Sequence, residues 1–327
     1  MVGSDTLLGR DLKEVLGAEG RNEITDFAAN AEGSFGSEEG EAVYLHPLDA
    51  ASVDSVDADI SAGNDLGATK AFELVQATER YVPLIDCTGA LDNRPEARIW
   101  PDTPQAASGK QRLFVVAHPA ASVIAQILEG LTSLHPIQRS VVEVFEPASE
   151  RGQKGISELQ QQTASLLSFK KLDKAVFDTQ LSFNLLAAYG EEAPVHLSTI
   201  EHRIEMHLAT LLARKGVSTP IPMPSLRLIQ APVFHGYSLS FWVEFSARPE
   251  VETIADTLAE RGLDVRKQGE EPPTNVGIAG QSGIAVGDIR ADRNNPRAIW
   301  IWAAADNFRI VADSVTALLS QLEAPAA

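Results

Sequence analysis

One segment constrains the fold of this chain more than any other: LFVVAHPAASVIAQILEGL, residues 113–131. It reads as a buried strand, a sharp turn and a helix that starts directly after the turn, which is a building unit of α/β folds. The N-terminus of such a helix has free N–H groups and a positive dipole end, so many α/β enzymes hold a nucleophile there. In this chain the turn reads HPAAS, and Ala121 stands where such a site needs a thiol.

The size and charge of the chain limit its class. The chain has 327 residues, and chains of this length usually fold around more than one hydrophobic core, so we expect two domains. The net charge is −18, and residues 22–69 contain eleven aspartates or glutamates and no lysine or arginine. Such a surface repels phosphate backbones, which excludes nucleic acid as a partner. No apolar stretch reaches the length of a membrane span, so we expect no membrane partner. Cys87 is the only cysteine, which is consistent with a cytoplasmic location.

A glycine-rich turn, VGSDTLLGRDL, opens the chain. Apolar positions at helical spacing follow it and end at Gly17, which predicts a helix that Asp5 or Thr6 caps. Only Met1 and Val2 stand before the turn, so we expect residues upstream to be missing from this numbering. Strand patterns over residues 41–48 and 81–90, with a helical pattern over 66–79 between them, predict a parallel sheet with crossovers.

The pattern changes after residue 131. Long strands are expected in three segments: RSVVEVFEP, PSLRLIQAPVFHGYSLSFWVEFSA and GIAVGDIRADRNNPRAIWIWAAA. Helices are expected over residues 155–167, 197–214, 251–262 and 307–322. Long strands with helices on one side predict an α+β domain built on a mostly antiparallel sheet.

Five motifs, in this order, resemble those of the aspartate-semialdehyde dehydrogenase family. They are VGSDTLLGRDL for V-G-A-T-G-x-V-G-R, LIDCTGA for I-D-N-S-S-A, AHPAAS for N-P-N-C-S, ASERGQKGISELQQQ for S-G-A-G-x-x-G-x-x-E-L-x-x-Q, and PVFHGYS with AADNFRIVADSV for P-V-x-x-G-H-S and A-D-N-x-R-K-G-A-A. The resemblance implies a Rossmann-like dinucleotide-binding domain from residues 1–117 and 305–327. It also implies an α+β dimerisation domain with a mostly antiparallel sheet over residues 118–304, and a homodimer formed through that sheet.

The family reaction, as the resemblance implies it, is reductive dephosphorylation of an acyl phosphate to an aldehyde. A cysteine takes the acyl group, NADPH gives hydride, a histidine moves protons and arginines hold the substrate. This chain departs at each catalytic position. Ala121 replaces the cysteine, Tyr237 the histidine, Gln230 an arginine and Glu146 a glutamine; Ala120 and Asp92 also differ from the family pattern. Catalytic groups that act as a unit fail together, so we expect the family reaction to be absent.

The resemblance also implies which residues would hold a dinucleotide. They are Gly3, Thr6, Gly9, Ser61, Gly63 and Asn307. Thr6 stands where the family has its middle glycine, so its Cβ narrows the space for a pyrophosphate, although its hydroxyl could bind a phosphate. The segment ITDFAANAEGSFG is acidic where a 2′-phosphate would need a basic residue. If a dinucleotide binds, we therefore expect NAD rather than NADP. We expect an empty site ahead of both.

Several residues could replace the missing catalytic cysteine or histidine, but each also has a structural interpretation. Cys87 is a candidate nucleophile, but a buried small residue at a strand end is the favoured interpretation. Ser122 is favoured as an N-cap or first-turn serine. His235 and Tyr237 are two residues apart, so on a common strand both side chains would point to the same face and could form an acid/base pair. The favoured interpretation is that polar aromatic residues simply line that face of the strand. Histidines at 196, 202 and 207 lack helical metal-ligand spacing, so no metal site is expected.

Three functions remain open. The first is a catalytically inactive homologue that binds or regulates a protein partner or ligand. The second is an NAD(P)-dependent oxidoreductase with chemistry that avoids a thioester. The third is an active semialdehyde dehydrogenase that uses Cys87. In each, Trp242, Trp300 and Trp302 of the large sheet are candidates for burial in a homodimer.

Overall fold

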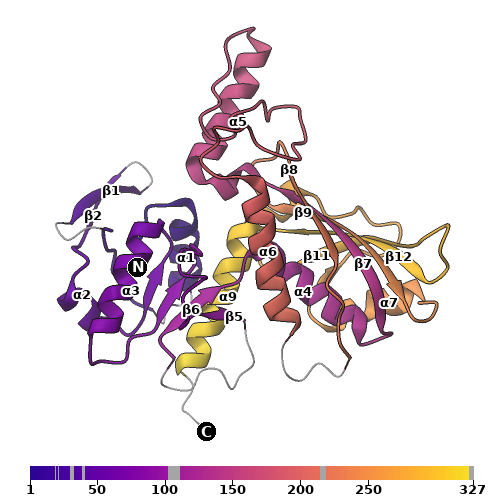
Figure 1. Cartoon of the computed structure of the whole chain (residues 1–327), viewed down its shortest axis with the longest axis horizontal. Coiled ribbons are helices and arrows are strands. Elements are labelled where there is room, and N and C mark those ends of the chain that lie inside the picture. Colours follow the sequence, from indigo (N-terminus) through magenta and orange to yellow (C-terminus); the bar gives the residue numbers. More distant parts are fainter. Residues whose placement is uncertain are drawn as a thin grey trace. The chain divides into compact units, whose positions relative to one another are not determined.

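The computed structural model describes residues 1–18, 20, 22–29, 33–38, 41–101, 111–213 and 219–323. The chain forms two compact units, which Figure 1 shows in sequence colours. Unit 1 consists of Met1–His118 and Val311–Ala327, and unit 2 consists of Pro119–Ile310. The second boundary lies inside the last helix, because the first turn of that helix is hydrogen-bonded within unit 2.

Unit 1 has a four-stranded parallel sheet in the order β3-β4-β6-β5, and a separate two-stranded antiparallel sheet, β1-β2. Its strands are β1 (Ser34–Glu38), β2 (Glu41–Leu45), β3 (Asp59–Ser61), β4 (Leu84–Asp86), β5 (Arg98–Trp100) and β6 (Leu113–Val116). Its helices are α1 (Leu7–Ala18), α2 (Ala50–Asp54), α3 (Asp65–Ala77) and the greater part of α9 (Asn307–Glu323).

The parallel sheet of unit 1 is buried on both faces, as helices on its two sides require. Ile85 and Phe114 pack in one apolar cluster with α1 and α9. Their strand neighbours Leu84, Leu113 and Val115 pack in a second cluster with α3. Alternate residues of each short strand therefore face different helices, which explains why these strands read as continuous apolar runs.

Two expectations for unit 1 hold only in part. Most of the strand expected over residues 41–48 is β2, which pairs with β1 as an antiparallel hairpin with Phe35 opposite Tyr44. The end of the segment does join the parallel sheet, because His46 bridges Phe27 in parallel, Phe27 bridges Val2, and Val2 bridges Ser61 of β3. The strand expected over residues 81–90 is limited to Leu84–Asp86, because the Asp86 carboxylate accepts the backbone N–H groups of Thr88 and Leu91 and turns the chain.

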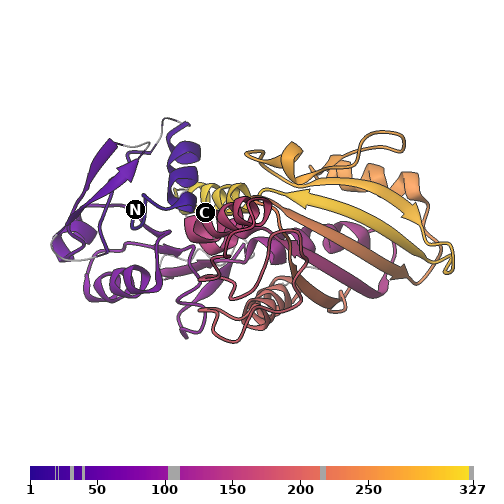
Figure 2. The ribbon, with the colours of Figure 1, turned by 90° about the horizontal axis from the view of Figure 1, so that it is seen from above.

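Unit 2 is built on a six-stranded sheet in the order β10-β11-β12-β9-β7-β8. The three central pairings are antiparallel, and the pairings at both edges, β10 with β11 and β7 with β8, are parallel. The strands are β7 (Ile137–Glu146), β8 (Ser225–Gln230), β9 (Tyr237–Phe245), β10 (Asp264–Val265), β11 (Ala285–Ala291) and β12 (Ala298–Ala305). Figure 2 shows the long strands running side by side.

The helices of unit 2 are α4 (Pro119–Thr132), α5 (Gly152–Leu167), α6 (Leu197–Leu212), α7 (Val251–Glu260) and α8 (Asn275–Ile278). Helices α4, α6 and α7 cover one face of the sheet and contact β7, β8 and β11, respectively. On the other face, Ile278 of α8 packs against Ala285 and Ala304. Val142, Phe241 and Ile301 form one cross-strand row on the covered face and are at most 2% exposed.

Residues 152–196, which we call the arm, consist of α5 and the loop that returns from its end (Figure 1). Two buried side chains of α5 hold this loop. Glu158 accepts the backbone N–H groups of Val176 and Phe177. Gln162 accepts those of Leu181 and Ser182 and donates to the carbonyl oxygens of residues 173 and 179. The E-L-x-x-Q motif is therefore a structural device that satisfies the backbone of the loop.

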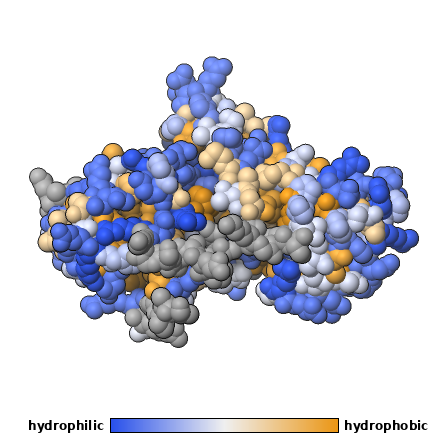
Figure 3. Space-filling view, turned by 60° about the horizontal axis from the view of Figure 1, so that its bottom comes forward, coloured by the Kyte–Doolittle hydropathy of each residue, from blue (hydrophilic) through white to orange (hydrophobic). Residues whose placement is uncertain are grey.

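Within the described ranges, no helix is both long and apolar enough to cross a membrane. Hydrophilic residues cover most of the face drawn in Figure 3, and apolar residues gather toward its middle.

Candidate functional site

The helix that would carry the family nucleophile begins at Pro119, where the missing N–H of proline costs no hydrogen bond. Ala120 and Ala121 follow in its first turn and are both 0% exposed. Ser122 lies in the first turn as well, so the first-turn interpretation holds and the N-cap alternative was wrong. Its hydroxyl is buried without a hydrogen-bond partner among the described residues. The methyl group of Ala121 has no lone pair and cannot form a thioester.

Three of the departing positions come together in unit 2. Glu146 and Gln230 end the neighbouring strands β7 and β8, where they pair in register. The Gln230 side chain donates to the Glu146 carbonyl oxygen over 2.8 Å and accepts from the Tyr189 hydroxyl over 2.5 Å. The Arg151 guanidinium lies 3.3 Å from the Glu146 carboxylate. Tyr237, which begins β9, completes what we call the polar cluster: Glu146, Glu150, Arg151, Tyr189, Gln230 and Tyr237.

Burial dominates the electrostatics of the polar cluster. Glu146 is 0% exposed, and burial raises its pKa to about 7, although the Arg151 guanidinium opposes this rise. Burial acts to lower the pKa of Arg151, but the Glu146 carboxylate and the other acidic groups around the guanidinium together outweigh burial, and the net pKa is raised. Burial, and next the Glu150 carboxylate, raise the pKa of Tyr237 well above its ordinary value. Tyr237 is therefore held as a neutral phenol and is unsuited to act as a base.

A second set of contacts uses residues that the chain shares with the family motifs. The Asn307 carboxamide oxygen accepts the backbone N–H of Gly236 over 3.1 Å and lies 3.2 Å from the Ser149 hydroxyl. Its NH₂ group donates to Glu150 over 2.9 Å. Asp306 caps α9 by accepting two of its backbone N–H groups. Asn307, predicted to bind a dinucleotide, is 1% exposed and its side chain fastens unit 2 internally.

His235 and Tyr237 do not share a strand face, so that expectation was wrong. Strand β9 begins at Tyr237, and Gly236 has a φ of +78°, which breaks the alternation before the strand starts. The His235 ring instead packs edge-on against Phe308, with 6.0 Å between ring centroids. The structure therefore does not form the acid/base pair that common strand placement would give.

Sequence reasoning missed Glu150, Arg151 and Tyr189. A signal for the first two was present, because the motif S-G-A-G reads SERG in this chain and two charged residues replace glycine and alanine. Tyr189 had no such signal, since it reaches Gln230 from 41 positions away in the sequence.

The glycine-rich turn lies in unit 1 and is packed tightly. A Cβ on Gly3 would lie 2.2 Å from the Cα of Gly63, and one on Gly9 would lie 2.1 Å from the Gly3 carbonyl oxygen. The Thr6 hydroxyl accepts the backbone N–H of Gly9 over 3.0 Å and lies 2.9 Å from the carbonyl oxygens of Gly3 and Ala62. Thr6, one of the two predicted caps, therefore caps α1.

These residues do not fit a dinucleotide pyrophosphate. The Thr6 hydroxyl is directed at the backbone of the turn itself and is used there. Asp5 places an exposed carboxylate beside the N-terminus of α1, where a phosphate would meet like charge. Ser61, at the end of β3, is 0% exposed, and its hydroxyl has no partner within the described part of the chain. In the acidic segment expected to disfavour NADP, residues 30–32 lie outside the described residues.

Cys87 follows β4 and packs against the apolar cluster that contains Ile85 and Phe114. Burial, and next the charge of Asp86, raise the pKa of its thiol well above the ordinary value. The thiolate, which is the nucleophilic form, is thereby disfavoured. Among the described residues, no three histidine, cysteine or acidic side chains form a group that could hold a metal ion.

The fold and the motif residues together define a dehydrogenase-type protein with an α/β unit and an α+β unit. The family description "Semialdehyde dehydrogenase, dimerisation domain" matches residues 128–310. The chain therefore belongs to the semialdehyde dehydrogenase family, which confirms the resemblance seen in the five motifs.

Curated relatives carry two kinds of name. A USG-1 protein homolog of Pseudomonas aeruginosa is 29% identical over 73% of this chain and 71% of its own length. One of Azotobacter vinelandii is 30% identical over 72% and 69%, respectively. An aspartate-semialdehyde dehydrogenase of Rickettsia bellii is 27% identical over 60% and 57%.

Solved structures share the fold of the whole chain. A probable aspartate-semialdehyde dehydrogenase from Pseudomonas aeruginosa has a TM-score of 0.82 and 24% identity, covering 98% of this chain and 96% of that one. Aspartate semialdehyde dehydrogenase II from Vibrio cholerae has a TM-score of 0.82 and 22% identity, covering 99% and 98%. The expected fold class, a Rossmann-like α/β unit with an α+β unit, is confirmed.

Proposed function

We propose that this chain is a non-catalytic member of the semialdehyde dehydrogenase family that acts as a binding or regulatory homologue. The observation that carries the proposal is Ala121, which offers only a methyl group, so the acyl group has no nucleophile to receive it. The polar cluster supports the proposal, because its members contact one another where the family motifs place the histidine, an arginine and a glutamine.

The glycine-rich turn supports the same proposal. With Asp5 beside the helix N-terminus and the Thr6 hydroxyl used internally, unit 1 is expected to bind neither NADP nor NAD. Thermal unfolding with NAD, NADH, NADP and NADPH tests this expectation. A ligand at a hundred times its dissociation constant adds about 2.7 kcal/mol of stability, which is readily measured. We expect no shift with any of the four; a clear shift would favour the oxidoreductase alternative.

Turnover is tested in the direction that produces reduced cofactor. Aspartate semialdehyde, phosphate and NADP⁺ would give acyl phosphate, NADPH and a proton, which absorbance follows. We expect no turnover from the wild-type chain, and none from Ala121→Cys, because Tyr237 and Gln230 still provide neither base nor guanidinium. If the wild-type chain turns over and Cys87→Ala abolishes the reaction, the proposal is wrong and the Cys87 alternative is correct.

We further propose that the chain forms a homodimer through the open face of the large sheet. Val141, Trp242 and Trp300 lie side by side on that face, and Val141 and Trp300 are 43% and 36% exposed. The match to a dimerisation domain supports this assignment. We expect light scattering to give the mass of a dimer for the wild type and of a monomer for Val141→Glu. A dimeric Val141→Glu variant would assign the interface elsewhere.

A further inference from the structure

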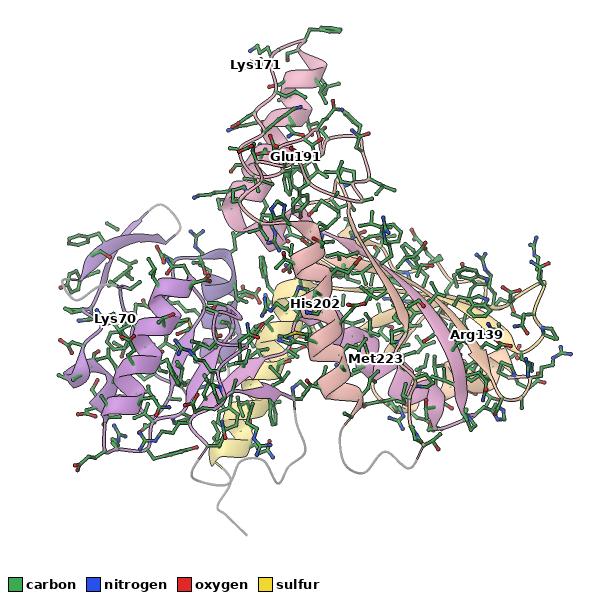
Figure 4. All side chains as sticks on the ribbon, viewed as in Figure 1. Lys70, Arg139, Lys171, Glu191, His202 and Met223 are labelled. Carbon is green, nitrogen blue, oxygen red and sulfur yellow. The ribbon has the colours of Figure 1, made fainter. Side chains whose placement is uncertain are left out.

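The arm packs around a small apolar core of its own. Leu159 of α5 and Phe177 and Leu181 of the return loop are buried in one cluster with Ala148, which precedes the arm. Figure 4 places Lys171 at the outer end of the arm and Glu191 nearer its base. A segment with its own core can open as a cooperative unit while the rest of the domain stays folded.

The return loop of the arm is fastened to β8, an edge strand of the large sheet. The N–H of Leu186 donates to the Gln230 carbonyl oxygen over 3.0 Å, and the N–H of Gln230 donates to the Leu186 carbonyl oxygen over 3.0 Å. The Tyr189 hydroxyl donates to the Gln230 side chain over 2.5 Å and lies 3.4 Å from the Glu146 carboxylate. We call Glu146, Arg151, Leu186, Tyr189 and Gln230 the arm base.

The Glu146 carboxyl lies at the arm base without a full set of partners. One oxygen is 3.3 Å from the Arg151 guanidinium and 3.4 Å from the Tyr189 hydroxyl, whereas charge-assisted hydrogen bonds are about 2.7–2.9 Å long. The other oxygen and the Arg151 Nε are buried and have no hydrogen-bond partner among the described residues. An ionised carboxylate placed here loses its hydration without full compensation, so the closed arm base favours the protonated form.

The ionisable groups that face Glu146 act on it in both directions. Glu150 and Arg151 lie in the turn before α5, Tyr189 lies on the return loop, and Tyr237 lies at the start of β9. Burial is the largest influence on Glu146 and raises its pKa to about 7. The Arg151 charge and the Tyr189 hydroxyl oppose this rise, while the Glu150 charge adds to it. Burial also raises the pKa of Tyr189 and of Tyr237 above the ordinary value, so both hydroxyls stay neutral.

We propose that the arm base is a pH-sensitive latch: when Glu146 ionises, the return loop separates from β8 and water reaches the carboxylate. The opening breaks the bridge between Leu186 and Gln230 and moves the Tyr189 hydroxyl away, and the proton of the carboxyl passes to the solvent. With the carboxyl protonated the latch stays closed, because an uncharged group costs less to bury. The latch adds a conformational response to the proposed function and does not depend on it.

Hydrogen exchange of the Leu186 and Gln230 amides tests the proposal, since both N–H groups lie in the bridge that the opening breaks. Each rate, divided by the rate of an unstructured peptide at the same pH, gives the opening equilibrium. A carboxyl whose pKa falls from about 7 in the closed latch to 4.5 in the open one predicts that opening increases about 70-fold from pH 5 to pH 8. Low concentrations of urea are expected to leave these rates unchanged, because local opening exposes little surface.

Three variants separate the latch from a general effect of charge. Glu146→Gln is expected to remove the pH dependence of opening, because its amide stays neutral. Tyr189→Phe is expected to increase opening about two- to tenfold at every pH, since it removes the hydrogen bond to Gln230, while the rise with pH remains. Glu191→Gln is the matched control: it changes an exposed glutamate of the same loop and is expected to behave as the wild type.

Four results would overturn the proposal. One is a wild type whose opening is the same at pH 5 and pH 8. The second is a Glu146→Gln variant whose opening still rises with pH, and the third is a Glu191→Gln variant that loses the rise as fully. The fourth is exchange of the bridge amides that follows the amides of β9 and increases equally with urea, because the arm would then open only when the whole unit unfolds. None of these results bears on turnover or on dinucleotide binding, so the inference and the proposed function fail separately.

Discussion

Replacing Glu146 with glutamine should change how stability depends on pH. In the folded chain burial raises the pKa of Glu146 to about 7, against 4.5 for a free glutamate side chain. Below about pH 4.5 the carboxyl is protonated in both states and contributes no difference. Between that pH and about 7 the unfolded chain releases the proton while the folded chain keeps it, so wild-type stability falls as the pH rises.

The size of the effect follows from the difference between the two pKa values. From 4.5 to about 7 is about 2.5 units, and each unit corresponds to about 1.4 kcal/mol, so the wild type loses about 3 kcal/mol across this window. Glu146→Gln has no such proton to lose. The Glu146→Gln variant also loses the charged partner of Arg151, which shifts its free energy of unfolding by a similar amount at every pH. The quantity to test is therefore the difference between variant and wild type, which should grow by about 3 kcal/mol from pH 4.5 to 8.

Urea unfolding followed by tryptophan fluorescence measures this difference. Trp242, Trp300 and Trp302 lie in unit 2 with Glu146, so a Trp100→Phe background makes the signal specific to that unit. Glu260→Gln, which changes an exposed glutamate of α7 in the same unit, controls for the loss of one acidic group. The reasoning would be refuted if the difference in free energy of unfolding between Glu146→Gln and the wild type stayed constant from pH 4.5 to 8. Glu146 would then not be a buried carboxyl whose partners only partly stabilise its charge.

Three further predictions test the local structure. Gly9→Ala should lower the melting temperature, because the new Cβ would lie 2.1 Å from a backbone oxygen. Gly17→Ala in the same helix is the control: its Cβ would meet nothing within 4 Å, so the free energy of unfolding should rise by about 0.5–1 kcal/mol. Gln162→Ala should speed proteolysis and hydrogen exchange in the loop that it holds, while the exposed Gln161→Ala leaves both unchanged. Cys87 should react slowly with a thiol reagent in the folded chain and quickly in urea, since burial raises the pKa of its thiol; fast reaction in the folded chain would contradict this.

Sequence reasoning predicted the long periodic elements well. The helices expected over residues 66–79 and 307–322 are α3 and α9, which begin and end within two residues of those limits. Strands β3 and β5 were missed because three residues are too few to show a period. The strand expected in the parallel sheet over residues 41–48 reaches that sheet through the parallel bridge of His46 with Phe27. Its pairing with β1 was missed, because an isolated strand pattern does not reveal which neighbour it pairs with.

The candidate site was predictable only as a set of departures. Motif order identified Ala121, Glu146, Gln230 and Tyr237 as positions where catalytic groups are replaced. It did not reveal what those side chains contact, because Tyr189 and Gln230 meet across 41 positions of sequence and Glu146 and Gln230 across 84. Contacts of that separation depend on the finished packing of β7, β8 and the arm, which no local pattern encodes.

A buried polar cluster that has no catalytic task would be expected to become apolar, because burying polar groups costs free energy. The geometry supplies a reason for its persistence. Gln230 donates to the carbonyl oxygens of Glu146 and Ala231, and Asn307 accepts the N–H of Gly236. The Ala231 carbonyl oxygen and the Gly236 N–H lie outside the strands, so the sheet ladder does not satisfy them, whereas the Glu146 carbonyl oxygen also accepts the N–H of Ala231 over 2.9 Å.

An apolar replacement at Gln230 would remove the bond to the Ala231 carbonyl oxygen, and one at Asn307 the bond to the Gly236 N–H, at a cost of about 1–3 kcal/mol each. The polar side chains at the strand ends therefore have a structural role that does not depend on turnover. Glu146 differs from them, since its second carboxylate oxygen has no hydrogen-bond partner among the described residues. Polar side chains at these strand ends are consequently weak support for catalysis. The absence of a sulfur at Ala121 says more about whether the chain can run the family reaction than any of the polar residues near it.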